Sequence, residues 1–93
     1  MALGTATLDF GATPIDEATI LVSGLSGLSV ASHKEAFVQG DDSTGDNNAA
    51  AHKLLAFSGR LFCEYVSATS MNVTCNLTLG LATGQFTIHW VTQ

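Results

Sequence analysis

Lysine and arginine are the scarcest functional groups in this 93-residue chain, which contains only Lys34, Lys53 and Arg60. A surface that binds nucleic acid or an anionic membrane needs several cations close together. Eight acidic residues instead give a formal net charge of −5. The composition therefore argues against nucleic acid and membranes as partners.

Cysteine and long apolar runs are also scarce. Two cysteines, Cys63 and Cys75, are too few for a disulfide framework. Buried free thiols are the favoured interpretation, and a cross-strand disulfide is the alternative. No run reaches the roughly 18 apolar residues of a transmembrane helix, and the N-terminal MALGTATLDF lacks the regions of a signal peptide. We therefore expect the chain to be made and folded in a cytoplasm.

Hydrophobic residues, by contrast, are abundant at 46%, while charged residues make up 12%. A disordered chain would combine low hydrophobicity with high charge. The length suits one domain, residues 1–93, with a thin core.

The clearest pattern lies in the C-terminal third. Apolar and polar residues alternate from Met71 to Leu79, which is typical of a strand with one buried face. The runs on either side fit as antiparallel partners, so we predict a three-stranded meander. The predicted pairs are Leu61–Leu77, Cys63–Cys75 and Tyr65–Val73 on one side, and Leu79–Phe86, Leu77–Ile88 and Cys75–Trp90 on the other. The predicted core is its apolar face: Leu61, Tyr65, Val73, Leu77, Ile88 and Trp90.

The remaining segments also favour strands. The fold class predicted is all-β, a small antiparallel β-sandwich or barrel-like domain with at most one short helix. Further strands are expected at Thr5–Phe10, Ala18–Ser23, Leu28–Ala31 and Glu35–Gln39, and a helix of one or two turns at Ala49–Leu55.

The segment Gly40–Asn48 contains no hydrophobic residue, so we expect a surface loop that is dispensable for folding. Asp42, Thr44, Asp46 and Asn48 have the alternate spacing of the first ligands of an EF-hand loop. The sixth position from Asp42 is Asn47 instead of glycine, however, and the twelfth is Lys53 instead of glutamate. A solvated loop is therefore favoured over a calcium site.

No constellation of residues indicates catalysis. His33, His52 and His89 lack the HxH or HxxxH spacing of metal ligands. Cys63 is expected to face the core, where a thiol is inert, and the carboxylates are scattered. We assign no catalytic, cofactor-binding or metal-binding residue and expect a protein that is not an enzyme.

On the outward face of the predicted meander, the positions contributed by its second and third strands are uncharged and rich in Thr and Asn, and a few apolar residues lie beside them. An isolated soluble domain usually carries more Lys and Glu on such a face, so this face is the predicted interface for self-association. Its residues are Phe62, Val66, Asn72, Thr74, Asn76, Thr78, Thr87, His89 and Val91.

Three stretches, ATLDFGATPIDEATILVSG, EAFVQGDDSTGDNNAAAHK and GQFTIHWV, cover about half the chain. In layout they resemble parts of small β-rich virion structural proteins of tailed bacteriophages. The resemblance implies a head decoration protein, or a fibre or tail accessory, built as a symmetric oligomer. From it we expect a capsid decoration (cement) protein of the virion, made in the host cytoplasm. Its partners would be copies of itself, with a trimer favoured, and a major capsid or tail protein. The resemblance assigns no site residue.

A small carbohydrate- or surface-binding β-module, associated with a tail or fibre, is the alternative. Trp90, Tyr65 or loop residues would then serve as the platform on which a sugar stacks. The predicted register argues against this alternative, because it places Trp90 on the apolar face.

Overall fold

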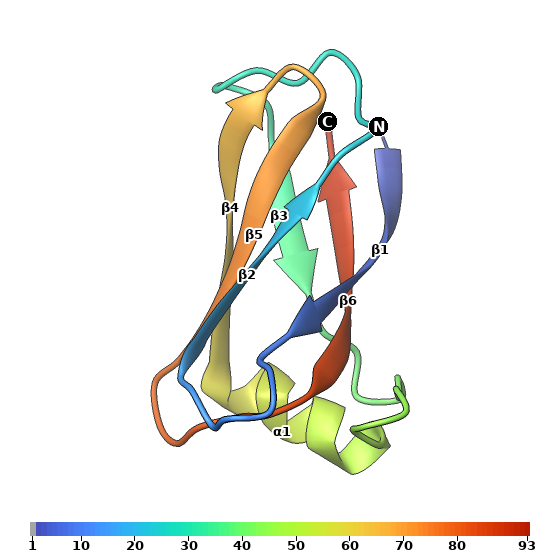
Figure 1. Cartoon of the computed structure of the whole chain (residues 1–93). Helices are drawn as coiled ribbons and strands as arrows, with labels where there is room; N and C mark the ends of the chain where they lie inside the picture. Colours follow the sequence, from blue (N-terminus) through green and yellow to red (C-terminus); the bar gives the residue numbers. More distant parts are fainter. Residues whose placement is uncertain (1) are drawn as a thin grey trace.

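The computed structural model describes residues 2–93, which form six strands and one helix. One antiparallel sheet has the order β1 (Ala2–Asp9), β6 (Gln85–Thr92), β3 (Lys34–Phe37). The other has the order β2 (Glu17–Val22), β5 (Ser70–Leu77), β4 (Gly59–Ser67). The sheets face each other, and helix α1 (Ala49–Ser58) lies at one end, here called the helix end (Figure 1). The expected all-β class is confirmed, as a sandwich and not as a closed barrel.

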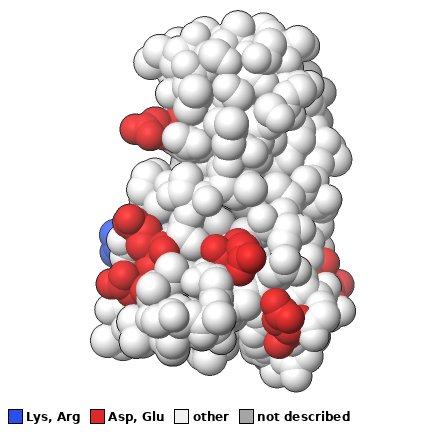
Figure 2. All heavy atoms as spheres, viewed as in Figure 1, with Lys and Arg blue, Asp and Glu red and all other residues white. Residues whose placement is uncertain are grey.

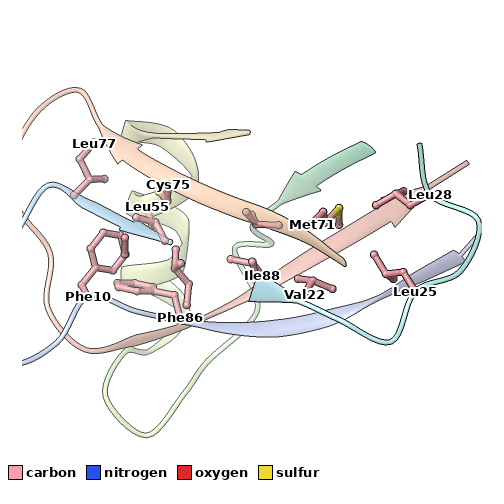
Figure 3. Close-up of a cluster of buried hydrophobic side chains, with 13 residues drawn as sticks. Phe10, Val22, Leu25, Leu28, Leu55, Met71, Cys75, Leu77, Phe86 and Ile88 are labelled. Carbon is pink, nitrogen blue, oxygen red and sulfur yellow. The ribbon is translucent and has the colours of Figure 1, made fainter. Parts of the chain in front are cut away.

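The core lies between the sheets, where the apolar faces of β5 and β6 meet (Figure 3). Val73, Cys75 and Ile88 are fully buried, and Leu77 is nearly so. The predicted core is correct for Val73, Leu77 and Ile88, while Leu61 and Trp90 are partly buried against it. Tyr65 was predicted wrongly, because its side chain is exposed on edge strand β4.

The predicted meander is wrong in its third strand. β6 pairs with β1 and β3 and does not pair with β5. The connection between β5 and β6 contains Gly80 and Gly84, both with positive φ, and it carries the chain across to the opposite sheet (Figure 1). Facing sheets bury the same apolar residues that side-by-side strands would bury, so alternation alone does not distinguish the two arrangements.

The pairing of β4 with β5 was predicted correctly, but its register was not. Leu61 lies opposite Cys75, and Cys63 opposite Val73, so each residue of β4 is shifted by two from its predicted partner. A shift of two leaves every side chain on its expected face. A β-bulge between Tyr65 and Ser67 accommodates one extra residue near the turn. Cys63 and Cys75 are therefore not cross-strand partners, and both are free thiols.

The other strands lie near their predicted positions, with one exception. Leu28–Ala31 is not a strand but part of the loop between β2 and β3. Leu25 and Leu28 of this loop are buried, and their backbone N–H groups donate to carbonyls of the β4–β5 turn. The loop thereby closes the end of the core that lies opposite α1 (Figure 3).

Helix α1 is longer than predicted and begins at a polar cap. The Asn48 side chain accepts a hydrogen bond from Ala51 N at 2.9 Å, which is the standard N-cap arrangement. The helix ends at Gly59, whose added Cβ would lie 2.8 Å from Leu55 O and 2.9 Å from Cys75 Sγ. Only glycine fits where the chain turns from the helix into β4.

Candidate functional site

An apolar groove lies at the helix end. It has a volume of about 480 Å³ and lies between α1 and the β5–β6 connection. Its inner lining consists of core residues, Leu55, Leu77 and Phe86. The groove is therefore an opening onto the hydrophobic core of the sandwich.

Four large apolar side chains line the rim of this groove, and all are well exposed. Leu54 and Phe57 of α1 are 66% and 90% exposed, and Leu79 and Leu81 of the β5–β6 connection are 82% and 64% exposed. Fully burying one such side chain is worth about 1.5–3 kcal/mol. Single exposed apolar residues are normal on proteins, but a contiguous group around a groove is typical of a binding site.

The rim follows from the sequence of α1 and of the connection. Leu54, Leu55 and Phe57 are spread over much of the circumference of the helix, so that only Leu55 reaches the core. In the connection, Gly80 takes a positive φ between the two exposed leucines. Leu79 was predicted to pair with Phe86 inside the meander; this was wrong, because the strand ends at Leu77.

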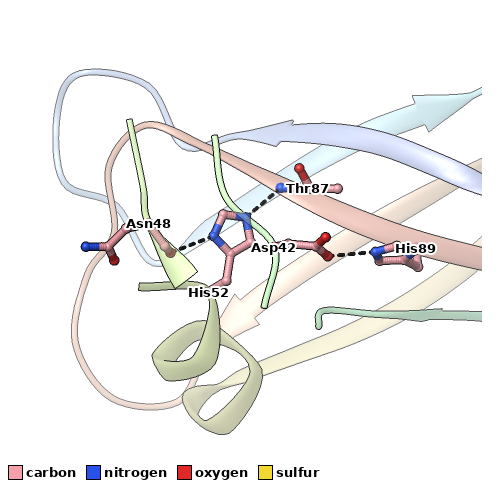
Figure 4. Close-up of polar contacts among 5 residues, drawn as sticks. All are labelled: Asp42, Asn48, His52, Thr87 and His89. Carbon is pink, nitrogen blue, oxygen red and sulfur yellow. Dashed lines mark hydrogen bonds and ion pairs between the residues drawn. The ribbon is translucent and has the colours of Figure 1, made fainter. Parts of the chain in front are cut away.

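His52 fixes α1 to the sheet, as Figure 4 shows. Its fully buried ring accepts a hydrogen bond at Nε2 from Thr87 N, at 2.9 Å. Nε2 must then be unprotonated, so the Nδ1–H group donates to Asn48 O, at 3.0 Å. The ring also packs edge-on against Phe86, with centroids 5.0 Å apart. His52 thereby positions the helix that forms one wall of the groove.

The acidic loop Gly40–Asn48 supplies a second set of anchors to β6. Strand β3 ends opposite His89, and the loop bonds the part of β6 beyond that point. Thr44 Oγ1 and Asn47 Nδ2 donate to Gln85 O at 2.6 and 2.8 Å, and Gln85 N donates to an Asp46 oxygen at 3.1 Å. The loop therefore supplies side-chain hydrogen bonds to β6 where no strand pairs with it. Contrary to the expectation from the sequence, we expect the loop to contribute to stability.

A shallow depression lined by carboxylates adjoins the groove and shares Thr83 with it. It has a volume of about 470 Å³ and is lined by Asp9, at the end of β1, and Asp46. More acidic residues lie near this end, such as Asp16 and Glu17, which bond to the last residues of β5. Figure 2 shows that most of the acidic side chains visible in this view gather on the half of the molecule that carries α1.

The predicted interface does not form one surface. Phe62, Asn72, Thr74 and Asn76 lie together on the outer face of the β2–β5–β4 sheet, where Phe62 is opposite Thr74. Val66 is also exposed on β4. The other positions belong elsewhere: Thr87, His89 and Val91 lie on the outer face of the opposite sheet, and Thr78 lies past the end of β5. The prediction failed here because it assumed that β6 pairs with β5.

Four of these side chains already have hydrogen-bond partners within the chain. Thr74 bonds to Thr19 and Asn76 to Glu17, and the other two are His89 and Thr78. His89 Nε2 lies 2.6 Å from Asp42 Oδ2, and its ring stacks on Phe37 at a centroid distance of 5.4 Å. Thr78 Oγ1 donates to Ser58 O at 3.0 Å. These contacts help to hold the loop and the helix in place. The His89 side chain is only 22% exposed, whereas Thr78 remains exposed.

Within residues 2–93, no group of three or more His, Cys, Asp or Glu side chains is placed to hold a metal ion. Burial raises the pKa of the Cys63 thiol, with opposing effects from nearby Lys34 and Glu35, and burial raises the pKa of Cys75 to about 11. Both cysteines are thus poor nucleophiles at neutral pH. No helix in the described part of the chain is long and apolar enough to cross a membrane.

Trp90 is not placed as a sugar-stacking platform. It lies opposite Gly4 in the β1–β6 pair, and its ring covers that glycine so closely that an added Cβ would lie 2.7 Å from the indole. Its Nε1 is buried and has no hydrogen-bond partner within the described residues.

Comparison of the chain with protein-family models, with curated proteins and with solved structures finds no match. The groove and its surroundings were also not assigned from the sequence. A detectable signal was present, however: a short helix with apolar residues on more than one side, and the run Leu79-Gly80-Leu81.

Proposed function

We propose that this protein is a structural protein of a virion, and that it acts as a capsid decoration protein. It associates with copies of itself through an outer sheet face and contacts a major capsid or tail protein through its helix end. The observation that carries the proposal is the apolar rim, where four large side chains stay exposed around a groove that opens onto the core. The virion context comes from the resemblance to phage structural proteins.

The surface for self-association is the outer face of the β2–β5–β4 sheet. Leu21 and Phe62 are 53% and 51% exposed there, on either side of the central strand. Between them the Thr19 and Thr74 hydroxyls are bonded to each other at 2.9 Å. The charged residues of this face lie on the two edge strands, so contact at its centre desolvates no charge. A trimer is the favoured oligomer, because the phage resemblance implies one.

Size exclusion coupled to light scattering tests this proposal. The expected result is a mass that is a multiple of the 9.7 kDa chain, and a shift toward the monomer for Phe62→Ser. The control is Val30→Ser, which changes an exposed apolar residue in the β2–β3 loop. A monomeric wild-type protein at high concentration would remove the self-association from the proposal.

A further inference from the structure

We propose that the groove at the helix end binds one kind of partner: a protein segment in which a large apolar side chain lies next to lysine or arginine. This inference rests on the proposed function and specifies the chemistry of the partner surface. It combines two adjoining features, the apolar groove and the carboxylate-lined depression.

The apolar part of the site suits an anchoring side chain. Phe57, Leu79 and their neighbours on the rim surround a space of about 480 Å³, and its inner lining is the core itself. An aromatic or long aliphatic side chain placed there would contact apolar side chains of α1, of the β5–β6 connection and of the core. Such an anchor in a pocket, surrounded by contacts that exclude water, is the usual source of binding energy at a protein interface.

The acidic part specifies the charge of the segment. Each carboxylate in the depression makes one backbone hydrogen bond: Asp9 Oδ1 accepts from Gly11 N at 2.7 Å, and Asp46 Oδ2 accepts from Gln85 N at 3.1 Å. Within residues 2–93 the ion pairs involve only histidines, so neither charge is neutralised by a lysine or arginine. Carboxylates beside an apolar groove favour a segment with a cation next to its anchor.

The same charges argue against a second copy of this chain as the occupant. Two helix ends brought face to face would place Asp9 and Asp46 of both copies near one another, and like charges at a contact are unfavourable. The nearest cation on α1 does not offset this, because Lys53 packs beside Gly40, on the side of the acidic loop. A negatively charged partner, such as nucleic acid or an anionic lipid surface, is disfavoured for the same reason.

The test is a selection of peptides from a random library by mRNA display. Wild-type protein is the target, and the library is first depleted on the Phe57→Ser variant. The expected result is enrichment of peptides with a large apolar residue flanked by Lys or Arg. The absence of enrichment, or the enrichment of acidic peptides, would overturn the proposal.

The selected peptide is then measured against single variants by fluorescence anisotropy. Phe57→Ser should weaken binding at least tenfold, and the double variant Asp9→Asn, Asp46→Asn at least threefold at low salt, with a smaller loss at high salt. Asparagine retains an oxygen that accepts the backbone hydrogen bond, so Asp9→Asn and Asp46→Asn should both preserve the fold. Val30→Ser and Glu64→Gln are matched controls at exposed positions away from the groove, and their affinity should stay within twofold. Equal losses in the controls would overturn the assignment to the groove.

Light scattering separates this inference from the proposed function. Phe57→Ser is expected to keep the oligomeric state of the wild type, because self-association uses the sheet face. If that variant alone became monomeric, the groove would hold a second copy, and this inference would fail while the structural role stood. If the wild type were monomeric but still bound the basic peptide, self-association would be refuted while the inference about the groove would stand.

Discussion

Replacing His52 tests whether one buried side chain holds the groove helix on the sandwich. Within the described residues, the His52 ring is the only side chain that accepts a hydrogen bond from Thr87 N. Because β3 stops opposite His89, no strand backbone takes over this role. The ring also fills the space beside Phe86, a core residue that lines the groove.

Two variants separate the polar contribution from the packing contribution. His52→Phe keeps a ring in place but leaves the Thr87 N–H group unpaired, which costs about 1–3 kcal/mol for a buried donor. His52→Ala adds a cavity, so its cost should reach about 3–5 kcal/mol, as for other large-to-small changes at buried rings. In a domain of this size, each kcal/mol lowers the melting temperature by about 4–8 °C.

Urea denaturation followed by circular dichroism measures both free energies of unfolding. Lys53→Ala is the control, because it changes the neighbouring exposed residue of the same helix and should stay within about 0.5 kcal/mol of the wild type. If His52→Phe were as stable as the wild type, the hydrogen bond to β6 would not contribute to holding the helix. The account of how the groove wall is positioned would then be refuted.

Three further predictions concern other parts of the fold. Replacing Asp41–Asp46 with a Gly/Ser linker should lower stability by about 1–4 kcal/mol, since several hydrogen bonds to β6 are lost; an unchanged melting temperature would show that the loop is dispensable. Gly4→Ala should displace Trp90 and alter its fluorescence, because the new Cβ would lie 2.7 Å from the indole ring; an unchanged spectrum would contradict this contact. Burial raises the pKa of Cys75 to about 11, so the thiol stabilises the fold below the unfolded-state pKa near 9.0, and this contribution is lost as the pH rises toward 11. A Cys75→Ala variant should therefore lose less stability than the wild type over that range, and parallel pH profiles would contradict the prediction.

Local pattern determined most of the elements of this protein. Alternation and β-branched residues identified the strands that became β1, β2, β4, β5 and β6, and the expected strand Glu35–Gln39 corresponds to β3. Alternation also assigned the buried face of β5 correctly. The Asn-rich segment before three alanines placed the start of the helix, because a polar cap and good helix formers act locally.

Tertiary structure decided how these elements are combined. Whether β6 lies beside β5 or opposite it depends on the β5–β6 connection and on competition from β1 and β3, and alternation is the same in both cases. Because β6 lies in the opposite sheet, the residues of the predicted interface are divided between the outer faces of the two sheets. This arrangement also left Leu79 and Leu81 exposed in the connection, beside a helix whose Leu54 and Phe57 find no place in the core. The groove therefore exists because segments far apart in the sequence meet at one end of the sandwich. The local pattern of each segment shows exposed apolar residues but does not show which other segment they will lie beside.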